Sequence, residues 1–211
     1  MLNANLYVDR IDLAPYLTPE EVKQSGSRDV RDLVARLQQG TLSLGECSFF
    51  TPTKRYALSL ALRATEVLPP VPSLELPRPV APDLFELNNP DPHSQVLVTG
   101  NSEFTLTVMT GLLAATVSPF YLLLVDCRGD TVDMAMVYRS FTPQRLTQSL
   151  DSHRLAMRLA HRRLLLPGIL APLWEELAAY TGWEIQVGPI CAGELPLFLG
   201  EAWQPPPGES W

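Results

Sequence analysis

Short apolar runs alternate with amphipathic stretches over residues 95–200, and this alternation limits the choice of fold more than any other feature of the chain. Tyr121–Val125 is continuously apolar, as expected for a central parallel strand covered on both faces. We predict a Rossmann-like α/β domain with a mostly parallel sheet over residues 95–203. The predicted strands are 95–99, 120–125, 131–137, 164–166 and 183–187, and the predicted helices are 103–115, 142–158, 169–181 and 191–199.

Prolines divide the chain. Eight of its 20 prolines fall within residues 69–92, and proline removes a backbone donor and favours extended structure. We therefore predict a Pro-rich linker over residues 69–94. Before it, helix-start signals at Thr18-Pro19 and Thr51-Pro52 predict a small helical domain over residues 1–68. After the α/β domain, residues 204–211 are predicted to be a flexible tail.

Composition excludes several classes of protein. The charge of −7 argues against a nucleic-acid protein, whose phosphate contacts need a basic face. Three separated cysteines do not form a disulfide framework, and no secretory signal is present, so a reducing, cytoplasmic location is expected. The uncharged stretch 104–125 contains Pro119, and we interpret it as a buried helix and a core strand, not as a membrane span.

Familiar catalytic signatures are absent from the sequence. There is no G-x-G-x-x-G, no P-loop, no G-x-S-x-G elbow and no metal-ligand spacing of histidines or cysteines. No catalytic residue and no metal ligand are predicted on this basis. In a parallel sheet, ligands bind in the loops at the carboxyl ends of the strands, here 99–103, 126–131, 138–142, 167–169 and 188–194.

Five segments carry a resemblance to a known family. They read VLVTGNSEFTLT (96–107), DCRGDTVDMAMVYRSFTP (126–143), HRRLLLPG (161–168), GWEIQVGP (182–189) and ELPLFL (194–199). The chain resembles the large (gamma) subunit of the corrinoid iron–sulfur protein of the acetyl-CoA pathway, over about 105 residues in the same order. The resemblance implies a corrinoid (cobalamin) cofactor and methyl transfer on cobalt, with a methyltransferase or another corrinoid protein as partner.

The resemblance also implies where the cofactor would lie. A flat corrin needs a broad apolar floor and backbone groups for its amide arms, which loops at strand ends supply. The implied cofactor-binding residues are Thr99, Asn101, Ser102, Thr105, Gly129, Val132, Ala135, Pro167, Gly168 and Gly188.

The sequence departs from the family in three places. Bulky residues over 136–140 stand where the family has small ones near the ring. In the family's four-iron cluster motif, the cysteine positions are here Val22, Ser25, Val30 and Cys47, so three of four thiolates are missing and no cluster is expected. The Pro-rich linker also replaces the TIM barrel of the full-length subunit, which puts its docking partners in doubt.

Three hypotheses remain open at this point. The first is a corrinoid-binding methyl carrier or corrinoid chaperone without its own cluster, which would be a carrier more than a stand-alone enzyme. The second is a cofactor-free relative kept as an interaction or assembly module, with its cleft filled by side chains such as Met136 and Tyr138. The third is an unrelated small-molecule enzyme, which would need a pocket joining Asp126, His161 and Glu194.

Overall fold

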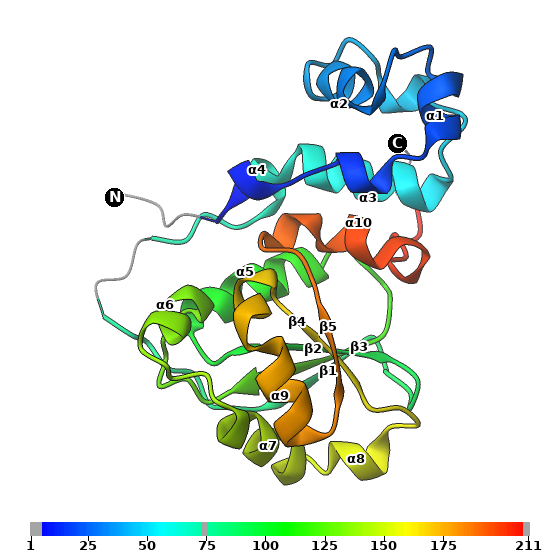
Figure 1. The fold of residues 1–211 in the computed structure, drawn as a ribbon. Helices are drawn as coiled ribbons and strands as arrows, with labels where there is room; N and C mark the ends of the chain where they lie inside the picture. The colour runs from blue at the N-terminus through cyan, green and yellow to red at the C-terminus, as the bar shows by residue number, and fades with distance from the viewer. Residues whose placement is uncertain (1–5, 73–75, 209–211) are drawn as a thin grey trace.

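The structure is a computed structural model that describes residues 6–72 and 76–208, and it has a central sheet with helices on both faces (Figure 1). The strands are β1 (Leu84–Leu87), β2 (Gln95–Gly100), β3 (Phe120–Val125), β4 (Arg163–Leu166) and β5 (Glu184–Val187). The α-helices are α1 (Pro19–Gln24), α2 (Val30–Gln38), α3 (Pro52–Leu62), α4 (Ala64–Val67), α5 (Glu103–Leu113), α6 (Val132–Val137), α7 (Pro143–Ser152), α8 (Leu155–Arg158), α9 (Trp174–Thr181) and α10 (Leu195–Leu199). The 3₁₀ turns are η1 (Val8–Arg10), η2 (Ala14–Tyr16), η3 (Leu44–Glu46), η4 (Gly168–Leu173), η5 (Ala192–Glu194) and η6 (Gly200–Ala202).

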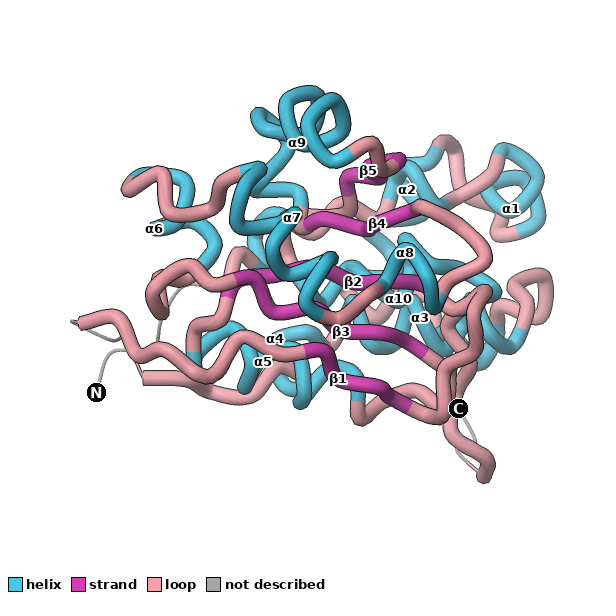
Figure 2. Tube along the Cα trace, turned by 90° about the horizontal axis from the view of Figure 1, so that it is seen from below, coloured by secondary structure: helices cyan, strands magenta, loops and turns pink. Residues whose placement is uncertain are grey.

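The five strands lie in the order β1-β3-β2-β4-β5, side by side in Figure 2. Strands β2 and β3 run parallel, from the pair Gln95–Phe120 to the pair Gly100–Val125, and β4 and β5 are parallel as well. Only β1, at the edge, is antiparallel to its neighbour. The predicted α/β class with a mostly parallel sheet is confirmed.

Side chains from the strands alternate between two apolar cores, as the period of two in a strand requires. Val96 and Val98 of β2 face a core closed by α7, α8 and α9, whereas Leu97 faces a second core closed by α5, α3 and α10. Strand β3 is buried along its whole length because both of its faces are covered. Figure 1 shows α7 and α9 on one side of the sheet and α5 on the other.

The uncharged stretch at residues 104–125 divides as the sequence predicted. Helix α5 occupies its first part and β3 its end, and Pro119 lies between them. Within the part of the chain that the structure describes, no helix combines the length and the apolar character needed to cross a bilayer.

One predicted strand is wrong. Of residues 131–137, Val132–Val137 form helix α6, not a strand, and Thr131 is its N-cap residue. The apparent alternation in VDMAMV suggested a period of two, but Val132 and Ala135 are the buried residues, at the i, i+3 spacing of a helix. A strand so soon after β3 would also pair as an antiparallel hairpin, whereas the chain here crosses over to reach parallel β4.

The Pro-rich segment is attached to the sheet. It carries β1, which the sequence analysis did not predict, and the Asp83 carbonyl extends that ladder by accepting from the Leu124 amide (2.9 Å). Val80 and Asn101 also exchange hydrogen bonds of 2.9 Å. Prolines on either side of β1 are tolerated because an edge strand needs backbone donors on one side only.

The N-terminal helices share packing with the α/β part. Helix α3 contributes Tyr56 and Leu60 to the core beneath α5, and Leu58 to a third apolar cluster that includes Cys47 and, from α10, Leu197. The division at residues 69–94 therefore stays a prediction. Of the predicted flexible tail, Gln204 is bonded to Ser118 and Thr116 (both 2.7 Å), and residues 209–211 lie outside the described residues.

Candidate functional site

A topological switch point lies between β2 and β4. After β2 the chain passes to α5 on one face, whereas after β4 it passes to η4 and α9 on the opposite face. Only one residue pair, Leu97–Leu165, joins β2 to β4 in the sheet ladder, whereas six pairs join β2 to β3. Diverging connections leave a crevice outside the carboxyl ends of such strands, where open α/β sheets bind their ligands.

A cavity of about 340 Å³ occupies this crevice. Its volume lies at the lower end of the range for small-molecule pockets, roughly 300–1,000 Å³. Its walls are mostly apolar and come from β2, β4, the first turns of α5, the start of α6 and the loop after β5. Its apolar lining residues include Phe104, Val108, Met109, Ile169 and Ile190.

Half of the ten residues that the sequence singled out line this cavity. They are Thr99, Thr105, Val132, Pro167 and Gly188. Thr99 is 4% exposed, and its hydroxyl has no hydrogen-bond partner among the described residues. It is therefore available to a ligand. A role for these five in binding a cofactor stays a prediction.

The other five residues do not line the cavity. Asn101 accepts at Oδ1 from the amides of Cys127 (2.7 Å) and Gly129 (3.3 Å), which joins the ends of β2 and β3. Ser102 caps α5 by accepting from the Thr105 amide (3.3 Å). The last two are Ala135, which lies in the core, and Gly168, where a Cβ would come within 2.7 Å of the Gly188 carbonyl.

The bulky segment 136–140 does not fill the cavity. Val137 and Tyr138 are 70% and 63% exposed, and Ser140 bonds to Asp130 (2.8 Å). None of these residues lines the cavity, because the segment is the end of a helix and only the start of that helix faces the crevice. The expected obstruction by Met136 and Tyr138 is therefore absent.

Sequence reasoning missed one wall of the cavity altogether. Leu6 and Tyr7, before η1, line it together with Asp133 of α6. The Tyr7 hydroxyl donates to Oδ2 of Asp133 (2.8 Å), and Thr131 donates to Oδ1 (2.5 Å). No local pattern could have revealed this contact, because it joins positions that are 126 residues apart.

Ionisation of this pair follows from its surroundings. Burial, and then the hydrogen bond to Asp133, raise the pKa of Tyr7 to about 12. Burial acts to raise the pKa of Asp133, but hydrogen bonds from Thr131 and Tyr7 outweigh it and the pKa is lowered. The folded state favours a neutral Tyr7 phenol that is bonded to an ionised Asp133 carboxylate. This pair contributes to the stability of the fold at pH values above the usual Asp pKa of 3.8 and below the usual Tyr pKa of 10.0.

The three residues of the small-molecule enzyme hypothesis do not meet. Glu194 accepts from Tyr16 (2.7 Å), whereas the His161 ring bonds to the Ser94 carbonyl (3.1 Å) before β2 begins. None of Asp126, His161 and Glu194 lines the cavity. No group of three or more potential metal ligands occurs in the described part of the chain.

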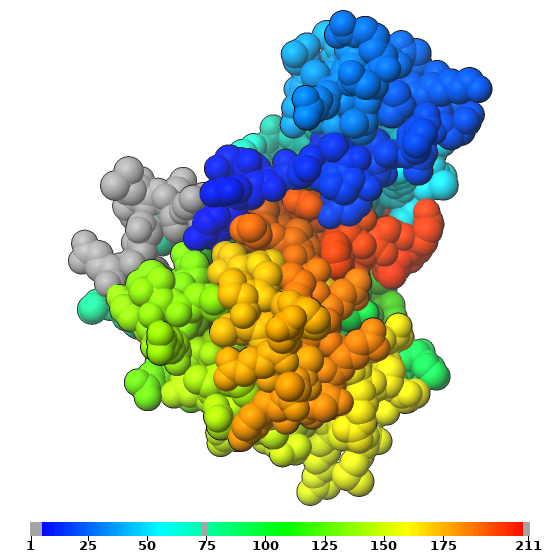
Figure 3. All heavy atoms as spheres, in the orientation of Figure 1, coloured from blue at the N-terminus to red at the C-terminus, as the bar shows by residue number. Residues whose placement is uncertain are grey.

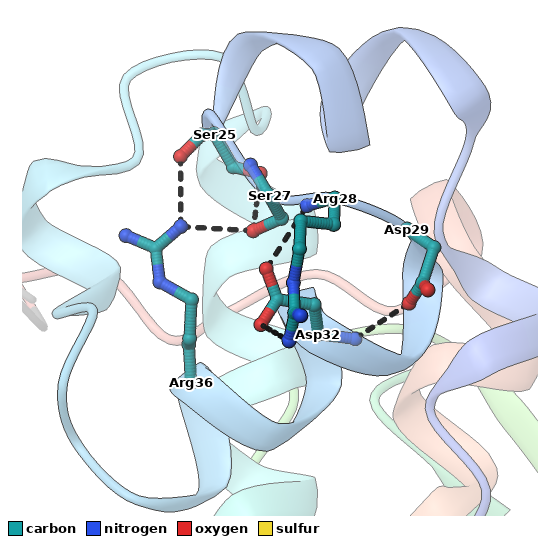
Figure 4. A network of polar contacts seen from close by, with 6 residues as sticks. All are labelled: Ser25, Ser27, Arg28, Asp29, Asp32 and Arg36. Atoms are coloured by element: carbon teal, nitrogen blue, oxygen red, sulfur yellow. Dashed lines mark hydrogen bonds and ion pairs between the residues drawn. The ribbon is translucent and has the colours of Figure 1, made fainter.

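Polar contacts connect α1 to α2 within residues 22–47, the segment compared above with the family's cluster motif (Figure 4). Arg36 donates to the Ser25 carbonyl (3.0 Å) and to Oγ of Ser27 (2.9 Å). Asp29 caps α2 by accepting from the Asp32 amide (2.9 Å). These contacts close the turn between the two helices.

The remaining cluster positions converge on apolar packing. Cys47 is fully buried in the third apolar cluster, and Val22 and Val30 pack against that same cluster. Burial raises the pKa of the Cys47 thiol, whose Sγ donates to the Ser43 carbonyl (3.3 Å). The site therefore has one thiol and otherwise apolar or hydroxyl side chains.

The fold and the crevice define an α/β protein with a ligand cavity at the strand ends. The family model described as "CO dehydrogenase/acetyl-CoA synthase delta subunit" (CdhD) matches residues 26–199. The chain belongs to this family. The match includes β2 to β5 and the segments that supply the cavity walls other than Leu6 and Tyr7.

Several curated proteins are similar over part of their length. The acetyl-CoA decarbonylase/synthase complex subunit gamma of Methanopyrus kandleri is 31% identical over 58% of this chain and 27% of its own length. The subunit of the same name from Methanocaldococcus jannaschii is 25% identical over 89% and 39%. The corrinoid/iron-sulfur protein large subunit of Moorella thermoacetica is 31% identical over 59% and 28%. The chain thus spans between about a quarter and two fifths of these relatives.

Proposed function

We propose that this chain is a corrinoid-binding protein that acts as a methyl carrier or corrinoid chaperone without an iron–sulfur cluster of its own. One observation carries the proposal. The chain belongs to this family, and the cavity at the switch point of its sheet is not filled by the bulky residues 136–140. The Moorella relative, whose name includes the corrinoid, supports the choice of cofactor.

The cavity walls suit a flat ring with polar arms. The half-buried Phe104 and Ile169 offer apolar surface, and the hydroxyls of Thr99 and Thr105 could bond to amide arms. Gly188 has no side chain to hold a ring edge away from the backbone. Because the volume is small, only part of a corrin would fit inside the cavity. When bound, it would supply a cobalt that accepts and releases a methyl group.

A protein partner is part of this proposal. A carrier must meet a methyltransferase or another corrinoid protein at the open side of its cofactor. Ile190, which lines the cavity, is 42% exposed, and the exposed Val137 and Tyr138 end the helix whose start faces the cavity. Exposed apolar side chains of this kind are typical of contact sites.

Titration with hydroxocobalamin tests the proposal directly. We expect the purified chain to retain stoichiometric cobalt after gel filtration and to show a base-off absorption spectrum. A corrinoid/iron–sulfur protein large subunit, treated in parallel, serves as the positive control. Loss of all cobalt from this chain, under conditions in which the control retains it, would contradict the carrier function.

The second candidate is a cofactor-free interaction module. The observation that favours it is that Leu6 and Tyr7 already form one wall of a cavity smaller than a corrin. The same titration separates the two candidates. If the chain takes up no corrinoid although its cavity is open, the interaction module is the remaining candidate function.

Anaerobic reconstitution with iron and sulfide tests the missing cluster. We expect less than one iron per chain, because a four-iron cluster needs thiolates at positions where this chain has Val22, Ser25 and Val30. Iron and acid-labile sulfide are measured after desalting. A content of about four iron and four sulfide per chain would show that other ligands hold a cluster.

A further inference from the structure

The N-terminal strap, defined as residues 6–16, lies along the upper side of the α/β part. In Figure 3 the dark-blue residues follow the orange and red C-terminal helices and reach the green α6 region. At its first end, Leu6 and Tyr7 form a wall of the cavity, and Tyr7 bonds to Asp133 across the crevice. The strap therefore joins α6 to the η5 region on the opposite side of the cavity.

The other end of the strap is anchored more deeply. Glu194, which is 9% exposed, accepts from the Tyr16 hydroxyl (2.7 Å) and from the Asp12 amide (3.3 Å). Next to it, Gly193 lies close to the strap, since a Cβ there would be 3.4 Å from Cδ1 of Ile11. A buried, bonded carboxylate is costly to expose, which makes this end the fixed one.

The Tyr7 end has fewer buried groups. Residues 6–10 include none that is fully buried, whereas Leu13, toward the other end of the strap, is 2% exposed. Segments with little buried apolar surface open locally at a small free-energy cost, without global unfolding. The Tyr7 end of the strap can therefore detach from the α/β part while Glu194 holds the other end in place.

We infer that the strap is a removable cover of the strand-end cavity, with the Tyr7–Asp133 hydrogen bond as its latch. Detachment would widen the crevice on the side of α6, which the cavity needs if a ligand as broad as a corrin is to enter. This inference concerns regulation of the site in the proposed function, but its first test does not depend on corrinoid binding.

Cys191 reports whether the strap is closed. Its thiol is fully buried, and a Cβ on Gly193 would lie 3.6 Å from its Sγ, close to Ile11 of the strap. Burial raises the pKa of this thiol, and the nearby carboxylates of Glu194 and Asp9 add to the effect. Cys191 belongs to the apolar core against which Leu6, Tyr7, Val8 and Ile11 of the strap pack. Cys47 and Cys127 are fully buried elsewhere and serve as internal controls.

The experiment compares thiol labelling in the wild-type chain and in Tyr7→Phe, which removes only the latch hydroxyl. With iodoacetamide and mass spectrometry, we expect Cys191 to react on the order of tenfold faster in the variant, since a hydrogen bond to a charged group is lost. Tyr180→Phe, at a tyrosine of α9 that is 54% exposed, is the matched control and should change nothing. Asp133→Asn should act in the same direction as Tyr7→Phe and provides a second route if that variant does not fold.

Two outcomes would overturn the inference. One is labelling of Cys191 at the wild-type rate in both latch variants. The other is equal acceleration of all three cysteines, which would indicate global loosening. Uptake of hydroxocobalamin is then followed: faster uptake by Tyr7→Phe supports gating, and unchanged uptake despite faster labelling contradicts it. If neither protein takes up corrinoid, the proposed function fails, and the labelling result alone decides whether the strap opens.

Discussion

Thr105→Trp is expected to abolish retention of hydroxocobalamin. Thr105 is half-buried in the first turns of α5 and lines the cavity, and its side chain makes no hydrogen bond within the described residues. An indole there fills space that the ring edge needs, yet the cap on its backbone amide from Ser102 is unaffected. We expect affinity to fall at least about tenfold, or about 1.4 kcal/mol, in the spectroscopic titration.

A matched variant separates occlusion from damage to the helix. Thr107→Trp places the same side chain two residues along α5 at an exposed position outside the cavity, and it should bind like wild type. Urea denaturation of both variants checks that α5 remains folded. Equal retention by Thr105→Trp and Thr107→Trp would place the cofactor elsewhere or remove it from the function.

Gly129→Ala is expected to cause a large loss of stability. Gly129 has φ +82°, and a Cβ there would come within 2.4 Å of the Pro79 nitrogen and 2.7 Å of the Arg78 carbonyl carbon. Left-handed backbone costs a residue with a side chain about 1–2 kcal/mol, and overpacking against rigid groups typically costs 1–3 kcal/mol more. Together they predict a decrease of about 2–5 kcal/mol in the free energy of unfolding, measured by urea denaturation.

Gly182→Ala isolates the steric part of that loss. Gly182 ends α9 at a similar φ of +69°, but a Cβ there would meet nothing within 4 Å. It should lose only about 1–2 kcal/mol, the cost of the backbone conformation. If both variants lose the same amount, contact between the Pro-rich segment and the loop after β3 does not contribute to stability.

Local sequence pattern was sufficient to predict an element where a short run of neighbouring residues determined its structure. The apolar run of β3 was predicted because burial alone explains it, and the starts of α1 and α3 were predicted because a cap residue and a proline mark each of them. Local pattern failed for α6, because its short apolar sequence fits both the period of a strand and the period of a helix. The edge strand β1 was missed because its four residues lie among prolines and pair only with distant β3.

The candidate site divides in the same way. Its position at the strand ends followed from strand–helix alternation, and Thr99, Thr105, Val132, Pro167 and Gly188 were identified from the sequence segments that the chain shares with its family. The sequence could not distinguish them from Asn101, Ser102 or Gly129, because polar and glycine residues in such loops serve binding and loop construction equally.

By itself, the sequence determined the α/β class, the order of most elements and the family. Only the tertiary structure decided that the bulky end of α6 leaves the cavity open and that Leu6 and Tyr7 form one of its walls. The physical reason is the distance along the chain over which each kind of interaction acts. Periodicity and capping act over a few residues, whereas the contact between Tyr7 and Asp133 exists only after the sheet and both helical layers have brought them together.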